Sequence, residues 1–329
     1  MKRDELALAL MMDFARYTGL LGNSDSRRYL WTDAFAVCNF LGIYRQTGDR
    51  EFLDLAVGLV NQVHHILGRH RNDDPRRGWI SGLSEHEGEL RPTCGGLRIG
   101  KPINERPPDQ PIDQRSEWDR DGQYYHYLTK WLHALHCTER QTGDARYHRW
   151  AVELAVVAQR SFTRCSFPGF PKQMVWKMSI DLSRPLVSSM GQHDPLDGLV
   201  TCLELQTDHD VSLDQAINEL TPMCAHGDWG TDDPLGVGGL LDAASRLAQL
   251  VFNRGVEYRG LLRQILVDVE TSLYDIAESS FLSNPAERRL AFRELGLSIG
   301  FQGLERINGI VSSDREISSL VASTAAVSH

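Results

Sequence analysis

Acidic side chains beside tryptophans stand directly before helical stretches of this sequence. The clearest case is SEWDRDGQYYHYLTKWLHALH, residues 116–136, in which Asp119 and Asp121 precede a run with apolar residues at helical spacing. Two neighbouring carboxyl groups can serve as a general acid and a general base. We therefore predict that Asp119 and Asp121 are catalytic. Helix capping is the alternative, and for Asp121 it explains the residue equally well.

Two further stretches carry groups of the same kind. In QHDPLD, His193 is a candidate acid or base because a histidine titrates near neutral pH, and Asp194 is a candidate second carboxylate. A capping arrangement of Asp194 with Asp197 is the alternative. In AHGDWGTDD, Asp228 is a further catalytic candidate, with an ordinary solvated loop as the alternative.

The predicted binding residues are the aromatic and polar side chains that accompany these acids. Tryptophan offers a flat apolar face to a ligand, and a lysine can hold a carboxylate or a phosphate. For the lysine, a solvated loop is the alternative. The set comprises Trp31, Asp33, Trp118, Tyr125, Trp176, Lys177, Gln192, His226 and Trp229.

The elements that must position these residues are paired amphipathic helices. Residues 31–49 lead into 50–67, and the helix after the opening stretch leads into a second run from 145, each pair turning on the tetrapeptide QTGD. The glycine of each turn can close the first helix in the left-handed conformation, and the aspartate can cap the second. Further helices are expected at about 4–19, 191–205, 212–224, 230–244, 257–279, 286–300 and 303–320.

Two segments between the helices are irregular. Residues 71–117 hold six of the thirteen prolines and are too long for a passive connector, so we predict a lid or a wall over a site. Residues 164–192 include VWKMSIDLSRP, which could form a short strand or an extended arm. Each Asp-Pro-Leu repeat, at Asp194 and at Asp233, predicts a helix start with the aspartate as cap.

Composition excludes several classes of protein. The chain has 329 residues, 41% of them hydrophobic, so it can build a sizeable core, while a net charge of −9 argues against nucleic-acid binding. No run of 18 apolar residues predicts a membrane span, and Asp4 and Glu5 interrupt what would be a secretory signal. Six scattered cysteines without a C-x-x-C pair favour reduced thiols in the cytoplasm. We expect no cofactor and no zinc, and leave a hard cation among the aspartates open.

The repeated hairpins with tryptophan and acid at alternate helix starts resemble the six-hairpin glycosidase-like (α/α)6-toroid superfamily. The resemblance lies in WTDAF, the two QTGD turns and CAHGDWGTDD, and covers nearly the whole chain. It implies an all-α fold, a single (α/α)6 barrel or toroid of helical hairpins over residues 1–329, with 71–117 as a lid-like insertion. In such a ring the inner helices start at the same end, so their acids and tryptophans would meet around one pocket.

The superfamily includes glycoside hydrolases, unsaturated glucuronyl hydrolases and N-acylglucosamine 2-epimerases, and therefore implies a small carbohydrate as the partner. Our main prediction is a glycoside hydrolase acting on a short glycoside, with Asp119 or Asp121 as the acid and Asp194 or Asp228 activating water. The alternative is a sugar 2-epimerase that uses histidines from helix starts, here His193 and His226. A non-enzymatic binding toroid is the third hypothesis, and the oligomeric state is left open.

Overall fold

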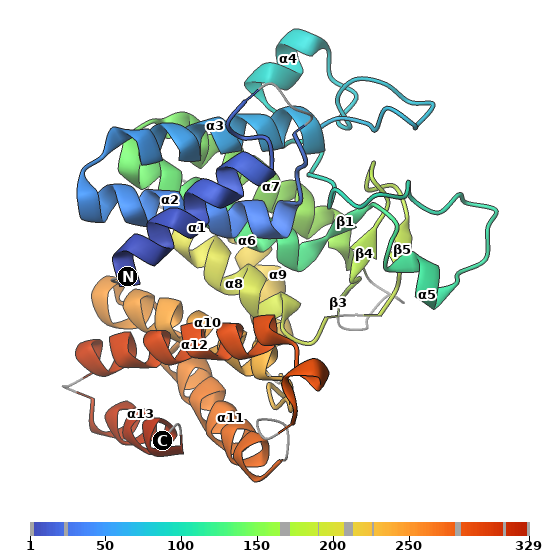
Figure 1. Ribbon diagram of the computed structural model, residues 1–329. Coiled ribbons are helices and arrows are strands. Elements are labelled where there is room, and N and C mark those ends of the chain that lie inside the picture. The colour runs from blue at the N-terminus through green and yellow to red at the C-terminus, as the bar shows by residue number, and fades with distance from the viewer. Residues whose placement is uncertain are drawn as a thin grey trace. The chain divides into compact units, whose positions relative to one another are not determined.

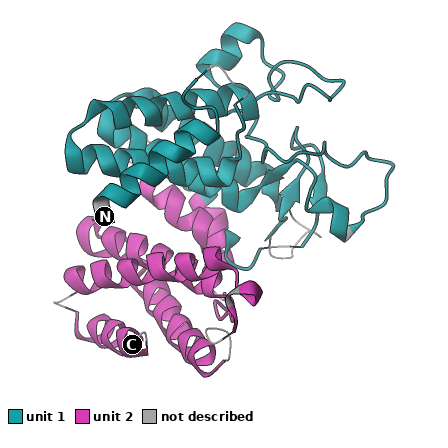
Figure 2. Cartoon of the chain, viewed as in Figure 1, with its two compact units in different colours: residues 1–194, 205–216 teal, residues 195–204, 217–329 magenta. Residues whose placement is uncertain are grey.

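The structure is a computed structural model in which helices account for most of the chain (Figure 1). The residues that it describes are 3–22, 26–164, 172–189, 191–206, 213–225, 227–279, 284–311 and 314–327. They form two compact units (Figure 2). Unit 1 comprises residues 1–194 and 205–216, and unit 2 comprises residues 195–204 and 217–329. A single domain over the whole chain stays a prediction.

Unit 1 is built from helices that come in hairpins, with a few short strands. Its helices are α1 (Arg3–Tyr17), α2 (Leu30–Thr47), α3 (Arg50–Leu67), α4 (Glu85–Leu90), α5 (Gln114–Glu117), α6 (Tyr125–Thr142) and α7 (Ala145–Phe162). Helices α8 (Asp194–Leu205) and α9 (Asp214–Cys224) have residues in both units. The strands are β1 (Gln123–Tyr124), β2 (Thr163–Arg164), β3 (Gln173–Met174), β4 (Lys177–Met178) and β5 (Pro185–Val187).

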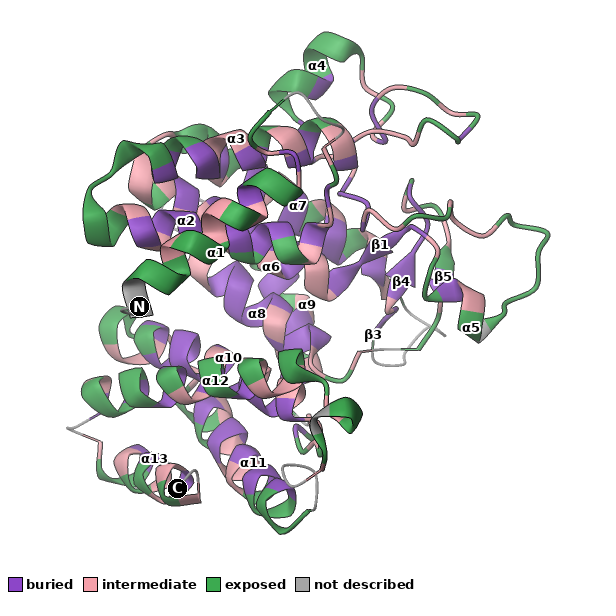
Figure 3. Cartoon of the chain, viewed as in Figure 1, coloured by how far each residue is buried: buried purple, intermediate pink, exposed green. Residues whose placement is uncertain are grey.

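Both predicted QTGD hairpins are confirmed. Gly48 ends α2 and Gly143 ends α6, each in the left-handed conformation, with φ of 73° and 69°. The aspartate that follows caps the next helix, since its side chain accepts the backbone N–H two residues later, at 3.0 Å for Asp49 and 2.9 Å for Asp144. Helix α2 therefore pairs with α3, and α6 pairs with α7, while α2 and α6 pack against each other. Their facing residues form a dry core (Figure 3).

A small antiparallel sheet joins the start of α6 to the second irregular segment. Its order is β1-β4-β5, with Gln123 opposite Met178 and Tyr124 opposite Lys177. The short strand expected around residue 177 is thus present. This pairing places Trp176 beside the residues that lead into α6, although some fifty residues separate them in the chain.

The segment 71–117 is irregular, as predicted. It contains the two short helices α4 and α5, and its apolar side chains still reach the core, since Trp79, Leu97 and Ile99 are buried. The buried side chains of this segment therefore contribute to the core of unit 1. The function of this segment as a lid stays a prediction.

Unit 2 is a group of longer helices. They are α10 (Pro234–Arg254), α11 (Arg259–Glu278), the short 3-10 helix η2 (Ala286–Arg288), α12 (Ala291–Ile310) and α13 (Arg315–Val327). Asp233 caps α10 as predicted, because its Oδ1 accepts the backbone N–H of Leu235 at 3.1 Å. Helix α8, by contrast, begins at Asp194 itself.

The prediction of separate helices over residues 286–300 and 303–320 was wrong. Helix α12 runs unbroken through Gly300 and Gly303, and the break comes after it. These glycines allow close packing and do not end the helix. A Cβ built on Gly300 would lie 2.7 Å from the Cα of Gly238 on α10.

The contact between α10 and α12 yields a prediction about neighbouring glycines. A Cβ on Gly238 would lie 2.2 Å from the carbonyl oxygen of Gly296, whereas a Cβ on Gly239 would meet nothing within 4 Å. We expect Gly238→Ala to lower the free energy of unfolding by about 1–3 kcal/mol through overpacking. We expect Gly239→Ala to raise it by about 0.5–1 kcal/mol, because alanine favours a helix. Urea denaturation of the two variants measures both effects, and equal effects would contradict the packing argument.

In the part of the chain that the structure describes, one helix is long and apolar enough to cross a membrane. This helix is α10, and 61% of its apolar 18-residue stretch is buried inside the protein. A mostly buried core helix passes the same test, so a single such helix is weak evidence for a membrane span.

Candidate functional site

The starts of α2 and α6 lie side by side in unit 1. Trp31, in the first turn of α2, and His126, in the first turn of α6, have ring centroids 5.9 Å apart, and Tyr127 lies 5.0 Å from Trp31. Seven residues further on, Cys38 of α2 lies close to His133 of α6. The two helices therefore run in the same direction, and their first turns lie next to each other.

His126 is held in a stack of aromatic rings. Its imidazole lies nearly parallel to the indole of Trp176, at 6.1 Å and 12°, and to the phenol of Tyr124, at 5.4 Å and 25°. Trp118 packs edge-on against Trp176 at 5.0 Å. Because the β1–β4 pairing supplies Trp176, the sheet and the start of α6 together orient the histidine ring.

Asp194 lies within ion-pair distance of the same histidine. The His126 Nδ1 and the Asp194 Oδ1 are 3.6 Å apart, and their side chains are 23% and 6% exposed. A carboxylate facing one imidazole nitrogen favours the tautomer with the proton on that nitrogen. The carboxylate of Asp194 therefore helps to orient the imidazole of His126 through Nδ1.

A small pocket adjoins this stack. It has a volume of about 220 Å³ and is lined by Ile112, Glu117, Trp118, Tyr124, Trp176, Val187 and Ser189. Three of these side chains also belong to the aromatic stack around His126. The pocket therefore offers aromatic and aliphatic surface close to the imidazole of His126, as ligand sites commonly combine apolar surface with a few polar groups.

Hydroxyl groups and a cation border the aromatic cluster on the α2 side. The Tyr29 and Tyr127 hydroxyls share a hydrogen bond of 2.6 Å, and the Lys101 ammonium lies 5.5 Å from the Tyr29 ring centre. Burial raises the pKa of Tyr127 above its usual range, and the hydrogen bond with Tyr29 adds to the rise. Tyr127 therefore stays neutral and can donate a hydrogen bond at neutral pH.

The structure explains Asp121 as a structural residue. Its side chain is fully buried, and Oδ2 accepts hydrogen bonds from Arg98 Nη1 at 2.7 Å and from Arg71 Nη1 at 3.4 Å. Its Oδ1 accepts the backbone N–H groups of Gly100 at 2.9 Å and Gly122 at 3.0 Å. With both oxygens bonded and no exposure, Asp121 ties the loop around residue 100 to the start of α6.

Asp119, the neighbouring acid that we also predicted to be catalytic, differs from Asp121 in its exposure to solvent. Asp119 is exposed, and neither Asp119 nor Asp121 is among the residues that line the pocket. Trp118 is 55% exposed and lines the pocket, and its role in binding stays a prediction. Its ring is available to a ligand.

Lys177 does not reach toward a ligand. Its ammonium is fully buried and donates to the Glu117 carboxylate at 2.9 Å, to the Glu117 carbonyl at 2.7 Å and to the Arg120 carbonyl at 2.9 Å. Burial lowers the pKa of Lys177, an effect that Glu117 opposes. The lysine fastens α5 to the sheet.

Asp33 also has a structural explanation. Its Oδ2 accepts the backbone N–H of Tyr29 at 2.9 Å, and its Oδ1 lies 3.6 Å from Nη1 of the buried Arg28. Burial raises the pKa of Asp33 to about 6, whereas Arg28 acts in the opposite direction. Asp33 therefore holds the residues that precede α2 against the first turn of that helix.

The remaining predicted residues are dispersed. Tyr125 is buried and donates its hydroxyl to Gln159 at 3.1 Å, as a core residue does. Gln192 is exposed, and the half-buried His193 stands directly before Asp194 in the chain. Their roles at a site stay predictions.

Asp228 and Trp229 belong to unit 2, and His226 lies outside the described residues. Trp229 is 1% exposed, and its backbone N–H donates to Asp268 at 3.2 Å, so its ring packs in the interior. Asp228 is exposed and accepts the N–H of Gly230 at 3.2 Å, as in a turn. Burial raises the pKa of Asp268, and the nearby Asp228 adds to this effect.

His126 is not among the site residues predicted from the sequence. The signal was present, because His126 stands in the first turn of the helix whose acids drew attention. What singles it out is the convergence of Trp31, Trp176 and Asp194 upon it, which no local pattern reveals.

Comparison with known proteins adds one informative match. No protein-family model matches the chain, and no curated protein matches it. Among solved structures, the chain is similar to cellobiose 2-epimerase from Spirochaeta thermophila DSM 6192, with a TM-score of 0.53 at 14% sequence identity. The match covers 87% of this chain and 72% of that chain.

This likeness shows the fold. The chain has the all-α fold of helical hairpins, of the (α/α)6-toroid type, that its sequence predicts. At 14% identity the match assigns no activity.

Proposed function

We propose that this chain is a carbohydrate-active enzyme that epimerises or isomerises a reducing sugar. The observation that carries the proposal is His126, paired with Asp194 at 3.6 Å and stacked on aromatic rings at the starts of α2 and α6. The fold that the chain shares with a cellobiose 2-epimerase supports the same class of substrate. Glycoside hydrolysis, our main prediction from the sequence, has weaker support.

The hydrolase hypothesis needs two working carboxyl groups facing one another across a bond. Retaining enzymes hold them about 5–5.5 Å apart, and inverting enzymes about 6.5–9.5 Å apart. Among the predicted acids, Asp121 is enclosed by Arg98 and Arg71, while Asp119 is exposed. Asp194 faces the imidazole of His126.

Epimerisation beside a carbonyl requires proton transfer at carbon. A base removes the proton from the carbon next to the aldehyde of the open-chain sugar, and return of a proton to the opposite face inverts that carbon. We assign the first role to His126, with Asp194 orienting its ring. His193, which adjoins Asp194 in the chain, is our candidate for the second.

The groups around His126 suit the charge that develops in this reaction. Loss of the proton leaves negative charge on the sugar oxygen, and neutral hydroxyl donors or a cation stabilise such charge. Tyr29 and Tyr127 supply the hydroxyls, and Lys101 supplies the cation. Trp118, Tyr124 and Trp176 offer apolar faces on which a sugar ring can stack.

The stacking role of Trp176 gives a test of substrate binding. We expect Trp176→Ala to raise KM by about twofold to tenfold with a smaller change in kcat, since an aromatic contact contributes about 0.5–1.5 kcal/mol. Steady-state kinetics on the best sugar of a screen measures both constants. Trp229→Phe serves as the control, because Trp229 is buried in unit 2. An unchanged KM in Trp176→Ala would remove this residue from the site.

Solvent exchange tests the reaction class. Free reducing sugars and short glycosides are incubated with the protein in deuterium oxide and analysed by mass spectrometry and NMR. Epimerisation is expected to place deuterium on the carbon next to the aldehyde without cleaving any glycosidic bond. Release of a new reducing end without deuterium at that carbon would instead establish the hydrolase, and binding without either change would favour a non-enzymatic toroid.

A further inference from the structure

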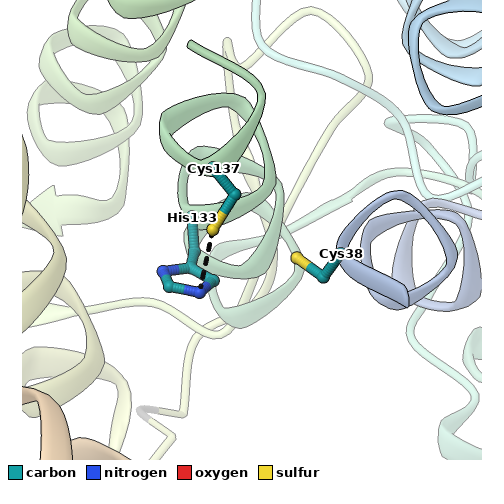
Figure 4. Close-up of side chains that lie close together, drawn as sticks. All are labelled: Cys38, His133 and Cys137. Atoms are coloured by element: carbon teal, nitrogen blue, oxygen red, sulfur yellow. Dashed lines mark hydrogen bonds between the residues drawn. The ribbon is translucent and has the colours of Figure 1, made fainter. Parts of the chain in front are cut away.

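Two cysteines and a histidine meet between α2 and α6, away from the proposed active site. Cys38 comes from α2, whereas His133 and Cys137 come from consecutive turns of α6 (Figure 4). Their sulfur and ring-nitrogen atoms all lie within 4.8 Å of one another, and the Cys137 sulfur is 3.5 Å from His133 Nε2. The cluster stands seven residues beyond Trp31 and His126, about 10 Å further along the helices.

We propose that Cys38, His133 and Cys137 bind a zinc ion. Zinc–sulfur bonds of about 2.3 Å and zinc–nitrogen bonds of about 2.0–2.1 Å place tetrahedral ligand atoms about 3.6–3.8 Å apart. The observed separation of 3.5 Å between His133 and Cys137 already matches this spacing, and Cys38 lies within about 1 Å of it. Side-chain rotation alone brings the three donors onto one ion.

The chemistry of the donors selects a soft metal. Two sulfurs and one imidazole suit zinc, whereas calcium and magnesium prefer oxygen ligands. Cys38 and Cys137 are both thiols and not joined in a disulfide. Cysteine coordinates metals as the thiolate, so metal binding at this site would release the thiol protons.

The site would link two helices that carry the proposed active site. His133 and Cys137 are four residues apart on one face of α6, and Cys38 projects from the neighbouring α2. A zinc ion here would tie α2 to α6 and stabilise the fold by RT ln(1 + [Zn²⁺]/Kd). The spacing of cysteines along the chain does not reveal this site, because Cys38 belongs to the first helical hairpin and Cys137 to the second.

A metal titration on the full-length reduced protein tests the proposal. Chelator-treated protein, kept reduced by a phosphine, is titrated with Co²⁺, which reports thiolate ligation through a sulfur-to-cobalt charge-transfer band. Zn²⁺ is then added in competition. We expect one equivalent of Co²⁺ to produce the band and one equivalent of Zn²⁺ to abolish it. Absence of the band in the reduced protein would overturn the proposal.

Serine variants identify the ligands. Cys38→Ser and Cys137→Ser are each expected to weaken binding by at least about 100-fold, since residues outside the ligand shell already contribute 10- to 100-fold. Cys94→Ser is the matched control, because Cys94 is a half-buried thiol of unit 1 outside the cluster, and it should bind as the wild type does. Wild-type affinity in either of the first two variants, with circular dichroism unchanged, would overturn the assignment.

A measurement on the unmutated chain keeps the test independent of variant folding. Zn²⁺ should slow alkylation of Cys38 and Cys137, followed by peptide mass spectrometry, and leave Cys94 unaffected. Equal protection of all three thiols, or of none, would contradict the site. A Cys38–Cys137 disulfide that forms in air, together with no metal binding after reduction, would replace the metal site with a redox pair.

Discussion

Replacing His126 with glutamine is expected to lower kcat for sugar epimerisation by at least about 100-fold while leaving the fold intact. A positioned acid or base contributes about 10²- to 10⁴-fold, and glutamine cannot carry a proton in the same way. The His126 ring packs against both Tyr124 and Trp176, and glutamine is small enough to fit the same space. Deuterium incorporation and steady-state kinetics measure the effect, and thermal unfolding confirms that the variant is folded.

The control for this variant is His86→Gln, on the exposed face of the short helix α4. We expect it to retain wild-type kcat and KM. We expect the kcat of Asp194→Asn to lie between those of His126→Gln and His86→Gln, because in our proposal Asp194 orients the His126 ring and transfers no proton itself. Wild-type kcat in His126→Gln would remove His126 from the mechanism. A complete loss in Asp194→Asn alone would return the chemistry to the carboxylates.

Replacing Asp121 with alanine is expected to lower the free energy of unfolding by about 3–5 kcal/mol. Removing one partner of a buried ion pair leaves the other charge buried and uncompensated, which costs about this much. Arg98 is 7% exposed and donates to Asp121 at 2.7 Å, so the variant strands its guanidinium, and two backbone N–H groups lose an acceptor as well. Urea denaturation at neutral pH measures the loss.

Asp119→Ala is the matched control for this prediction. Asp119 is exposed two residues away, and substitutions at such surface positions usually change stability by less than about 0.5 kcal/mol. We therefore expect the two variants to differ by several kcal/mol. Similar stability in both would show that Asp121 is not a structural anchor and would restore it as a candidate catalytic acid.

The local features of the fold could be predicted from the sequence. Helical periodicity, the two QTGD turns and the Asp-Pro-Leu cap at Asp233 depend on residues that are close in the chain, and the structure bears them out. The family resemblance of the sequence implied an all-α fold of helical hairpins, and the structural comparison shows that fold. The helix break predicted near Gly300 failed, because a glycine can serve close packing with a distant helix as well as a helix end.

The sequence by itself determined where helices begin, and it placed acids and aromatic residues at those starts. Only the tertiary structure decided which of them work together. An aspartate before a helix has the same local pattern whether it is enclosed by arginines, as Asp121 is, or faces a histidine, as Asp194 does. The difference comes from side chains dozens of residues away, such as Arg98 and Trp176, that long-range packing of α2, α6 and the small sheet brings into contact.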